Sequence, residues 1–125
     1  MLTRQRFDVS TGSGVWTDTG PPFTGAVQQM RWDAITGDTG GDLQLSLLSE
    51  GAADTGNGWV FYDNNDCLGA DFTNVPVQPS HSSDGFDTGV DQYNPIVAAG
   101  DRLRVKVTPG GSAVVGTLFV WTYSG

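Results

Sequence analysis

Residues 102–123 read RLRVKVTPGGSAVVGTLFVWTY, and this stretch decides the fold class. Leu103, Val105 and Val107 alternate with charged residues, which is the period-two pattern of a strand with one buried face. The Pro-Gly-Gly-Ser sequence at 109–112 has the composition of a tight turn. The chain then returns through residues 113–123, which read as a second strand. We therefore expect residues 102–123 to form a β-hairpin.

The returning strand is apolar on both of its faces. One side carries Val115, Phe119, Trp121 and Tyr123, and the other carries Val114, Leu118 and Val120. Such a strand is either central in a sandwich or covered by another subunit. Phe119, Trp121 and Tyr123 are therefore candidate interface residues.

The period-two pattern recurs along the rest of the chain, and no stretch shows a sustained helical period. Further strands are expected at residues 3–9, 25–35, 42–49, 58–62 and 72–77. In the second of these, Ala26, Met30 and Trp32 should share one face. About seven or eight short strands separated by turns predict an all-β single domain over residues 1–125, a β-sandwich of jelly-roll-like or Greek-key topology.

The composition favours the same fold class. A chain of 125 residues can bury a substantial core, and its 18 Gly and 6 Pro indicate many short elements joined by turns. Thirteen of the 14 acidic residues are Asp, and Lys106 is the single lysine. Asp suits turns, whereas Glu and Lys suit helix surfaces, so this balance favours strands and turns over helices.

The charge and the sequence pattern limit the partners. A net charge of −8 argues against nucleic acid as a partner. No apolar run is long enough for a membrane span, and the first residues lack the apolar stretch of a signal peptide. The single cysteine, Cys67, excludes an internal disulfide. We expect synthesis in the cytoplasm, with no nucleic acid and no membrane as partners.

Residues capable of catalysis are few. His81 lies among serines and near Asp84, but neighbours in one loop rarely adopt the geometry of a catalytic triad. Cys67 has no histidine nearby in sequence and is expected to be a small, half-buried thiol. We expect no catalytic residue, and a hydrolase that uses His81 is the least favoured alternative.

Acidic loops at residues 38–42, 63–66 and 84–91 provide oxygen atoms at short spacing. None matches the calcium-binding loop of an EF-hand, and turns use Asp and Asn for their own backbone hydrogen bonds. We expect no metal and no cofactor.

Aromatic residues leave a second class of function open. Trp16, Trp59, Phe61 and Tyr62 could form a platform for sugar rings, which would require at least two coplanar, exposed rings among them. The other interpretation is that these rings belong to the core. A carbohydrate-binding or receptor-binding module, at a head fibre or tail tip, is therefore the alternative function.

The positive charge is concentrated in two segments. Five of the six basic residues alternate with apolar ones, namely Arg4, Arg6, Arg102, Arg104 and Lys106. Each group should form one outward face, while most acids lie in expected loops. Such a face is either simply solvated or docks on an acidic surface of a neighbouring copy or partner. We take the five residues as interface candidates.

Several stretches resemble small virion proteins of tailed bacteriophages. They are GAV at 25–27, DLQL at 42–45, NPIVAAGDRLRV at 94–105, PGG at 109–111 and GTLFV at 116–120. The resemblance implies an all-β decoration (cement) protein, a homotrimer on the outer surface of the capsid. It further implies that the chain self-associates, bridges neighbouring major capsid proteins, and is located in the virion after synthesis in the host cytoplasm.

Overall fold

The computed structural model describes residues 1–49, 51–52, 58–76 and 96–124. These residues form seven strands and contain no helix, so none of them belongs to a helix that could cross a membrane. The strands are β1 (Leu2–Ser10), β2 (Trp16–Thr36), β3 (Asp42–Leu48), β4 (Trp59–Asn64), β5 (Phe72–Asn74), β6 (Ile96–Thr108) and β7 (Val115–Tyr123). The predicted all-β fold class is confirmed, and each strand predicted from the alternation is present.

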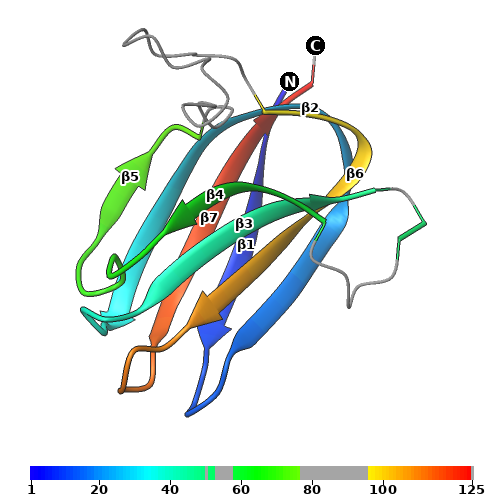
Figure 1. The fold of residues 1–125 in the computed structure, drawn as a ribbon. Coiled ribbons are helices and arrows are strands. Elements are labelled where there is room, and N and C mark those ends of the chain that lie inside the picture. The colour runs from blue at the N-terminus through cyan, green and yellow to red at the C-terminus, as the bar shows by residue number, and fades with distance from the viewer. Residues whose placement is uncertain (50, 53–57, 77–95, 125) are drawn as a thin grey trace, which may run out of the picture.

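The strands form two layers of a β-sandwich that share β2 (Figure 1). The first half of β2 pairs with β6, and β6 pairs with β3, which pairs with β4. The second half of β2 pairs with β7 and with the short β5, and β7 pairs with β1. All of these pairings are antiparallel. One 21-residue strand therefore passes from one layer into the other.

β2 changes layers at a bend that the sequence provides for. Its register with β6 breaks between Thr19 and Pro22 and again between Phe23 and Thr24. Gly25 follows with a φ of 145°. A Cβ atom at Gly25 would lie 2.0 Å from the carbonyl oxygen of Tyr123, so β2 can cross the end of β7 this closely only with glycine at the crossing.

The core lies between the two layers. The even-numbered residues of β7, Leu118 and Val120, face the odd-numbered residues of β6 across it, and Trp32 is fully buried among them. Burying one such aliphatic side chain contributes about 2 kcal/mol relative to leaving it exposed. β7 is central in its layer, between β1 and β2. Of the two explanations for its two apolar faces, a central strand or a strand covered by another subunit, the structure shows the first.

A bulge in β2 makes one face prediction wrong. Met30 and Trp32 point into the core as expected, but Val27 takes the core position that we predicted for Ala26. The register between β2 and β7 shifts between Val27 and Gln29. The extra residue at this bulge reverses the alternation, and Gln28 and Gln29 are both exposed.

The predicted hairpin is also wrong. β6 pairs with β2 and β3, whereas β7 pairs with β1 and β2, so the turn at 109–112 carries the chain from one layer to the other. The carboxylate of Asp38 holds this turn, because its Oδ2 accepts the N–H groups of Gly110 and Ser112 at 2.8 and 3.1 Å. Its Oδ1 accepts the N–H of Gly40 at 3.0 Å. These three hydrogen bonds lower the pKa of Asp38 below its ordinary value.

Candidate interaction surface

The eight interface candidates divide between the two outer faces of the sandwich. β1 and β7 lie in one layer and bring Arg4, Arg6, Phe119, Trp121 and Tyr123 to its outer face. β6 lies in the other layer, and its candidates Arg102, Arg104 and Lys106 belong to the opposite outer face, because Leu103, Val105 and Val107 fill the core side. The alternation within each strand was predicted correctly, but the two basic groups form two surfaces.

The outer face of the β1–β7–β2 layer combines aromatic rings with arginines. The register places Phe119 between Arg6 of β1 and Arg31 of β2. Trp121 lies between Arg4 and Gln29, and Tyr123 lies opposite Leu2. We call this surface the aromatic–arginine face and define it by Arg4, Arg6, Arg31, Phe119, Trp121 and Tyr123. Arg31 is the member that our sequence analysis did not single out, because it is the single basic residue of its strand.

The side chains of this face hold one another in place. The guanidinium of Arg4 lies 4.7 Å from the centroid of the Phe119 ring, and that of Arg6 lies 5.8 Å from it. The Phe119 and Trp121 rings are 5.9 Å apart and tilted by 37°. Cation–π contacts of this kind stabilise exposed sites by about 0.5–1 kcal/mol. The face is therefore ordered before any partner arrives, which reduces the entropic cost of binding.

Two acids offset part of the positive charge on the same face. Arg6 Nε lies 2.9 Å from Asp8 Oδ1, and Arg31 Nε lies 2.6 Å from Asp33 Oδ1. Exposed pairs of this kind stabilise the fold by less than about 1 kcal/mol, so their main effect here is to orient the arginines. Three arginines and two acids leave the face with a small positive charge on a chain whose net charge is −8.

One end of the face is open to solvent. Leu2 is 58% exposed and Tyr123 is 48% exposed, although both are large and apolar or amphipathic. Together with Trp121 and two glutamines, Gln28 and Gln29, they line an open hollow of about 600 Å³. An aromatic hollow beside arginines has the composition that marks the energetic centre of protein–protein interfaces.

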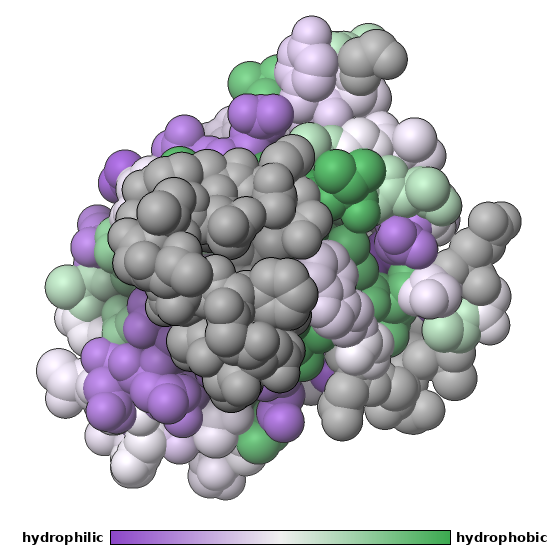
Figure 2. Space-filling model, turned by 45° about the horizontal axis from the view of Figure 1, so that its top comes forward, coloured by the Kyte–Doolittle hydropathy of each residue, from purple (hydrophilic) through white to green (hydrophobic). Residues whose placement is uncertain are grey.

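The hollow lies towards the end of the sandwich that carries both termini, since Leu2 begins β1 and Tyr123 ends β7. Figure 2 turns this end forward and shows hydrophobic side chains in several groups with hydrophilic side chains between them. Single exposed hydrophobic residues are normal on soluble proteins.

The opposite face provides weaker candidates. Arg104 is only 8% exposed, and its register neighbours are Thr19 of β2 and Ser46 of β3. The expectation that Arg104 presents a surface charge is therefore wrong. Arg102 donates a hydrogen bond to the carbonyl oxygen of Ala52, and Lys106 is partly exposed.

The aromatic platform required for sugar binding is not formed by the predicted residues. Trp59 is 45% exposed, but its neighbour Phe61 is buried, and the two rings are tilted by 45°. Tyr62 and Trp16 pack against the core. The coplanar, exposed pair that the alternative function needs is therefore absent among these four rings.

The structure describes some of the remaining chemical candidates. Cys67 is half-buried, donates to the carbonyl oxygen of Asn64 at 3.3 Å, and has its pKa raised to about 11 by burial. Asp38 and Asp42 serve as acceptors for backbone N–H groups, and the described residues contain no cluster of metal-binding side chains. His81 and the acidic stretch 84–91 lie outside the described residues.

No family model matches the sequence, and no curated protein matches it. The resemblance to phage decoration proteins therefore stays a prediction.

Three solved structures are similar to the chain at low levels. They are dimeric latent PorU from Porphyromonas gingivalis (TM-score 0.46, 11% identity, 97% of this chain), FLHE (0.45, 14%, 99%) and infectious bursal disease virus strain Gx (0.36, 10%, 100%). The chain spans 12% of the PorU chain, 97% of the FLHE chain and 32% of the viral chain. One of the three is thus a viral structure, but the TM-scores are too low for any of these likenesses to assign a function.

Proposed function

We propose that this chain is a non-catalytic structural protein of a virion, which self-associates through the aromatic–arginine face. In the finer form of the proposal, it is a homotrimeric decoration protein that bridges neighbouring major capsid proteins on the outside of a tailed-phage head. The phage assignment rests on the resemblance in sequence alone. The proposal that the chain self-associates rests on the composition of the aromatic–arginine face.

The observation that carries the proposal is the row of rings on the outer side of β7, where Phe119 and Trp121 are half-buried and Tyr123 is exposed. Phe119, Trp121 and Tyr123 occupy alternate positions of a central strand, where a solvated sheet face would normally carry polar side chains. Arginines flank the row on both sides. Tyr, Trp, Phe and Arg are the residue types enriched at interfaces, whereas Asp8 and Asp33 on the same face belong to a depleted type.

The solution mass of the purified protein tests the first part of the proposal. Size-exclusion chromatography with light scattering should give three times the 13.2 kDa chain mass. Trp121→Glu places an acid among the rings without touching the core, and it should reduce the mass to that of a monomer.

Trp59→Glu is the matched control, because it makes the same chemical change on the edge strand β4 of the other layer. It should leave the trimer intact. A wild-type monomer at high protein concentration, or a Trp121→Glu variant of unchanged mass, would contradict the assignment of this face.

Co-sedimentation with purified heads of the parent virion tests the capsid part. Wild-type protein added to heads that lack it should bind to saturation, and Arg4→Glu should lower the occupancy, because it reverses a charge on the aromatic–arginine face through which the protein assembles. Saturable binding would support the finer proposal. No binding to the heads by a correctly assembled wild-type protein would refute it.

A further inference from the structure

β1 leaves one edge of its layer open. Among the described strands it pairs with β7 alone, and its nine residues do so without a register shift. Backbone hydrogen bonds join Met1 to Ser124 and Thr11 to Val114, just beyond the two ends of this ladder. Because hydrogen-bonded and non-bonded pairs alternate in an antiparallel ladder, the odd-numbered residues of β1 bond to β7. The N–H and C=O groups of the even-numbered residues 2–10 therefore point away from β7, to the open edge.

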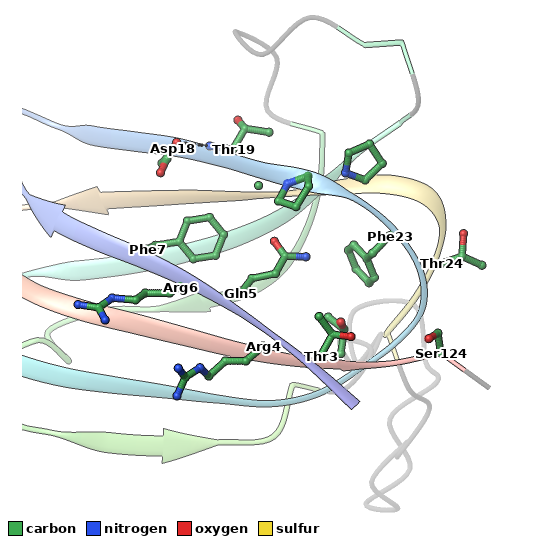
Figure 3. A pocket seen from close by; sticks show the side chains of 14 residues that line it. Thr3, Arg4, Gln5, Arg6, Phe7, Asp18, Thr19, Phe23, Thr24 and Ser124 are labelled. Carbon is green, nitrogen blue, oxygen red and sulfur yellow. Dashed lines mark hydrogen bonds between the residues drawn. The ribbon is translucent and has the colours of Figure 1, made fainter. Parts of the chain in front are cut away.

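A groove runs along this edge. It lies between β1 and the segment of β2 that precedes the bend, and it has a volume of about 530 Å³ (Figure 3). Gln5 and Phe7 line it from β1, and Phe23 lines it with Pro21 and Pro22 from the other layer. The two layers are separated here because β2 turns across the end of the sandwich instead of continuing beside β1.

An unpartnered polar atom lies in the wall of the groove. Gln5 is 8% exposed, and its Oε1 has no hydrogen-bond partner among the described residues. This oxygen packs against Gly20 of β2, where an added Cβ atom would lie 2.1 Å from it. Leaving a buried carbonyl oxygen unpaired costs about 1–3 kcal/mol, and such atoms are rare in native folds. A donor that enters the groove reaches Oε1 only when the Gln5 amide turns away from Gly20.

We propose that the β1 edge and this groove receive an extended peptide segment of a partner protein, which adds as a further strand beside β1. Its backbone pairs with the even-numbered residues of β1. Every second side chain enters the groove, and the one opposite Gln5 donates a hydrogen bond to Oε1 once the amide has turned from Gly20 towards the groove. The side chains between them lie on the outer face, where acidic residues meet Arg4 and Arg6.

A second copy of this chain fits the same edge less well. β1 of another molecule could pair with the backbone, but its inward side chains, Phe7 and Val9, are buried in that molecule's own core. They could not enter the groove, and Gln5 Oε1 would remain unpaired. A segment outside any packed sheet has its alternate side chains free. The β1 edge adjoins the aromatic–arginine face and shares Arg4 and Arg6 with it, but this inference does not depend on the proposed capsid role.

A designed peptide provides the probe. The nonapeptide Thr-Ser-Lys-Val-Glu-Asn-Glu-Val-Thr, blocked at both ends, places Asn opposite Gln5 and Glu opposite Arg4 and Arg6 when it lies antiparallel to β1. Titration into the ¹⁵N-labelled full chain should shift the β1 amides to saturation. Bound peptide should slow hydrogen exchange at Arg4, Arg6 and Asp8, whose amides the free protein leaves unprotected.

Two variants of Arg6, one to proline and one to alanine, separate the contribution of backbone pairing from that of charge. Arg6→Pro removes an N–H that β7 does not use, and edge strands tolerate proline. It should abolish saturable binding, whereas Arg6→Ala should weaken binding only severalfold. Equal binding by both variants would overturn the strand-addition mode.

A double-mutant cycle between Gln5 and the peptide's Asn tests the groove, and it does not require the Arg6→Pro variant to fold. Replacing the peptide's Asn with Val should weaken binding to the wild type about tenfold. Against Gln5→Met the two peptides should bind alike, because the acceptor is gone. The same tenfold loss against Gln5→Met, or no saturable shift with either peptide, would overturn the proposal. So would a concentration-dependent dimer that Arg6→Pro abolishes, since it would show a second copy on this edge.

Discussion

The carboxylate of Asp38 accepts the N–H of Gly110 at 2.8 Å, across 72 residues of chain. The same carboxylate holds Ser112 and Gly40, so one side chain fixes the turn through which the chain passes between layers. The composition of residues 109–112 does not predict that Asp38 contacts this turn.

We expect Asp38→Ala to destabilise the fold at neutral pH. The pKa of Asp38 lies below its ordinary value of 3.8 in the folded state, because backbone N–H groups favour the charged form. Its contribution is therefore fully present above pH 3.8 and is lost as the pH falls through the lowered folded pKa. Thermal unfolding should show a lower Tm for Asp38→Ala at pH 7, with the gap to wild type closing below pH 3.8. Asp18→Ala, at an exposed acid that binds only its neighbour Thr19, is the control and should change little.

Arg104→Glu should destabilise the fold instead of altering a surface contact. Arg104 is 8% exposed, so an acid in its place would be a largely buried charge. Burying an ionised carboxylate is unfavourable unless it is paired. Thr17→Glu adds an acid at an exposed position of the same face and should be nearly neutral. Urea unfolding of the two variants measures the difference. An Arg104→Glu variant as stable as Thr17→Glu would show that the Arg104 side chain is not buried in solution.

Gln5→Met should stabilise the free protein by about 1 kcal/mol, because it replaces an unpaired buried amide with an apolar side chain of similar length. Gln29→Met, at an exposed position of the same layer, should leave the stability unchanged. Chemical denaturation of the three proteins gives the comparison. A destabilised Gln5→Met would mean that the amide is already satisfied in solution.

Cys67 should react slowly with alkylating reagents. Burial raises the pKa of its thiol to about 11, so the nucleophilic thiolate is scarce at pH 8. Iodoacetamide should modify the native protein far more slowly than the urea-unfolded chain, and the native rate should rise steadily between pH 8 and pH 10. A fast, pH-independent native rate would contradict the raised pKa.

The alternation of apolar and polar residues predicted where the strands lie, but not which strands pair with one another. Residues 102–107 form part of β6, and the predicted side faces the core. This could be predicted because the polarity of each side chain in a strand reflects whether that position is buried. The composition of residues 109–112 indicates only that the chain turns there. Whether the two strands pair depends on Asp38, far away in sequence, and on the other strands that compete for the same edges. In β2 the extra residue at the bulge, beside Gln28, reversed the alternation without a signal in the sequence.

The surface was only partly predictable for the same reason. Arg4 and Arg6 were singled out separately from Phe119 and Trp121, and the β1–β7 register unites them. Arg31 joins the face through the β2–β7 register. The orphan oxygen of Gln5 depends on which segment of β2 lies opposite, so no local pattern could identify it.

The pairing of Leu2 with Tyr123 also bears on how the protein is made. β1 is synthesised early but has no partner until β7, at the other end of the described chain, leaves the ribosome. Most of β2 likewise waits for β6 and β7, since β5 pairs only with residues 30–32 of it. The loops that must close are long, so folding should be slow. During that interval two unpaired strands are exposed, and the net charge of −8 is what keeps nascent chains apart.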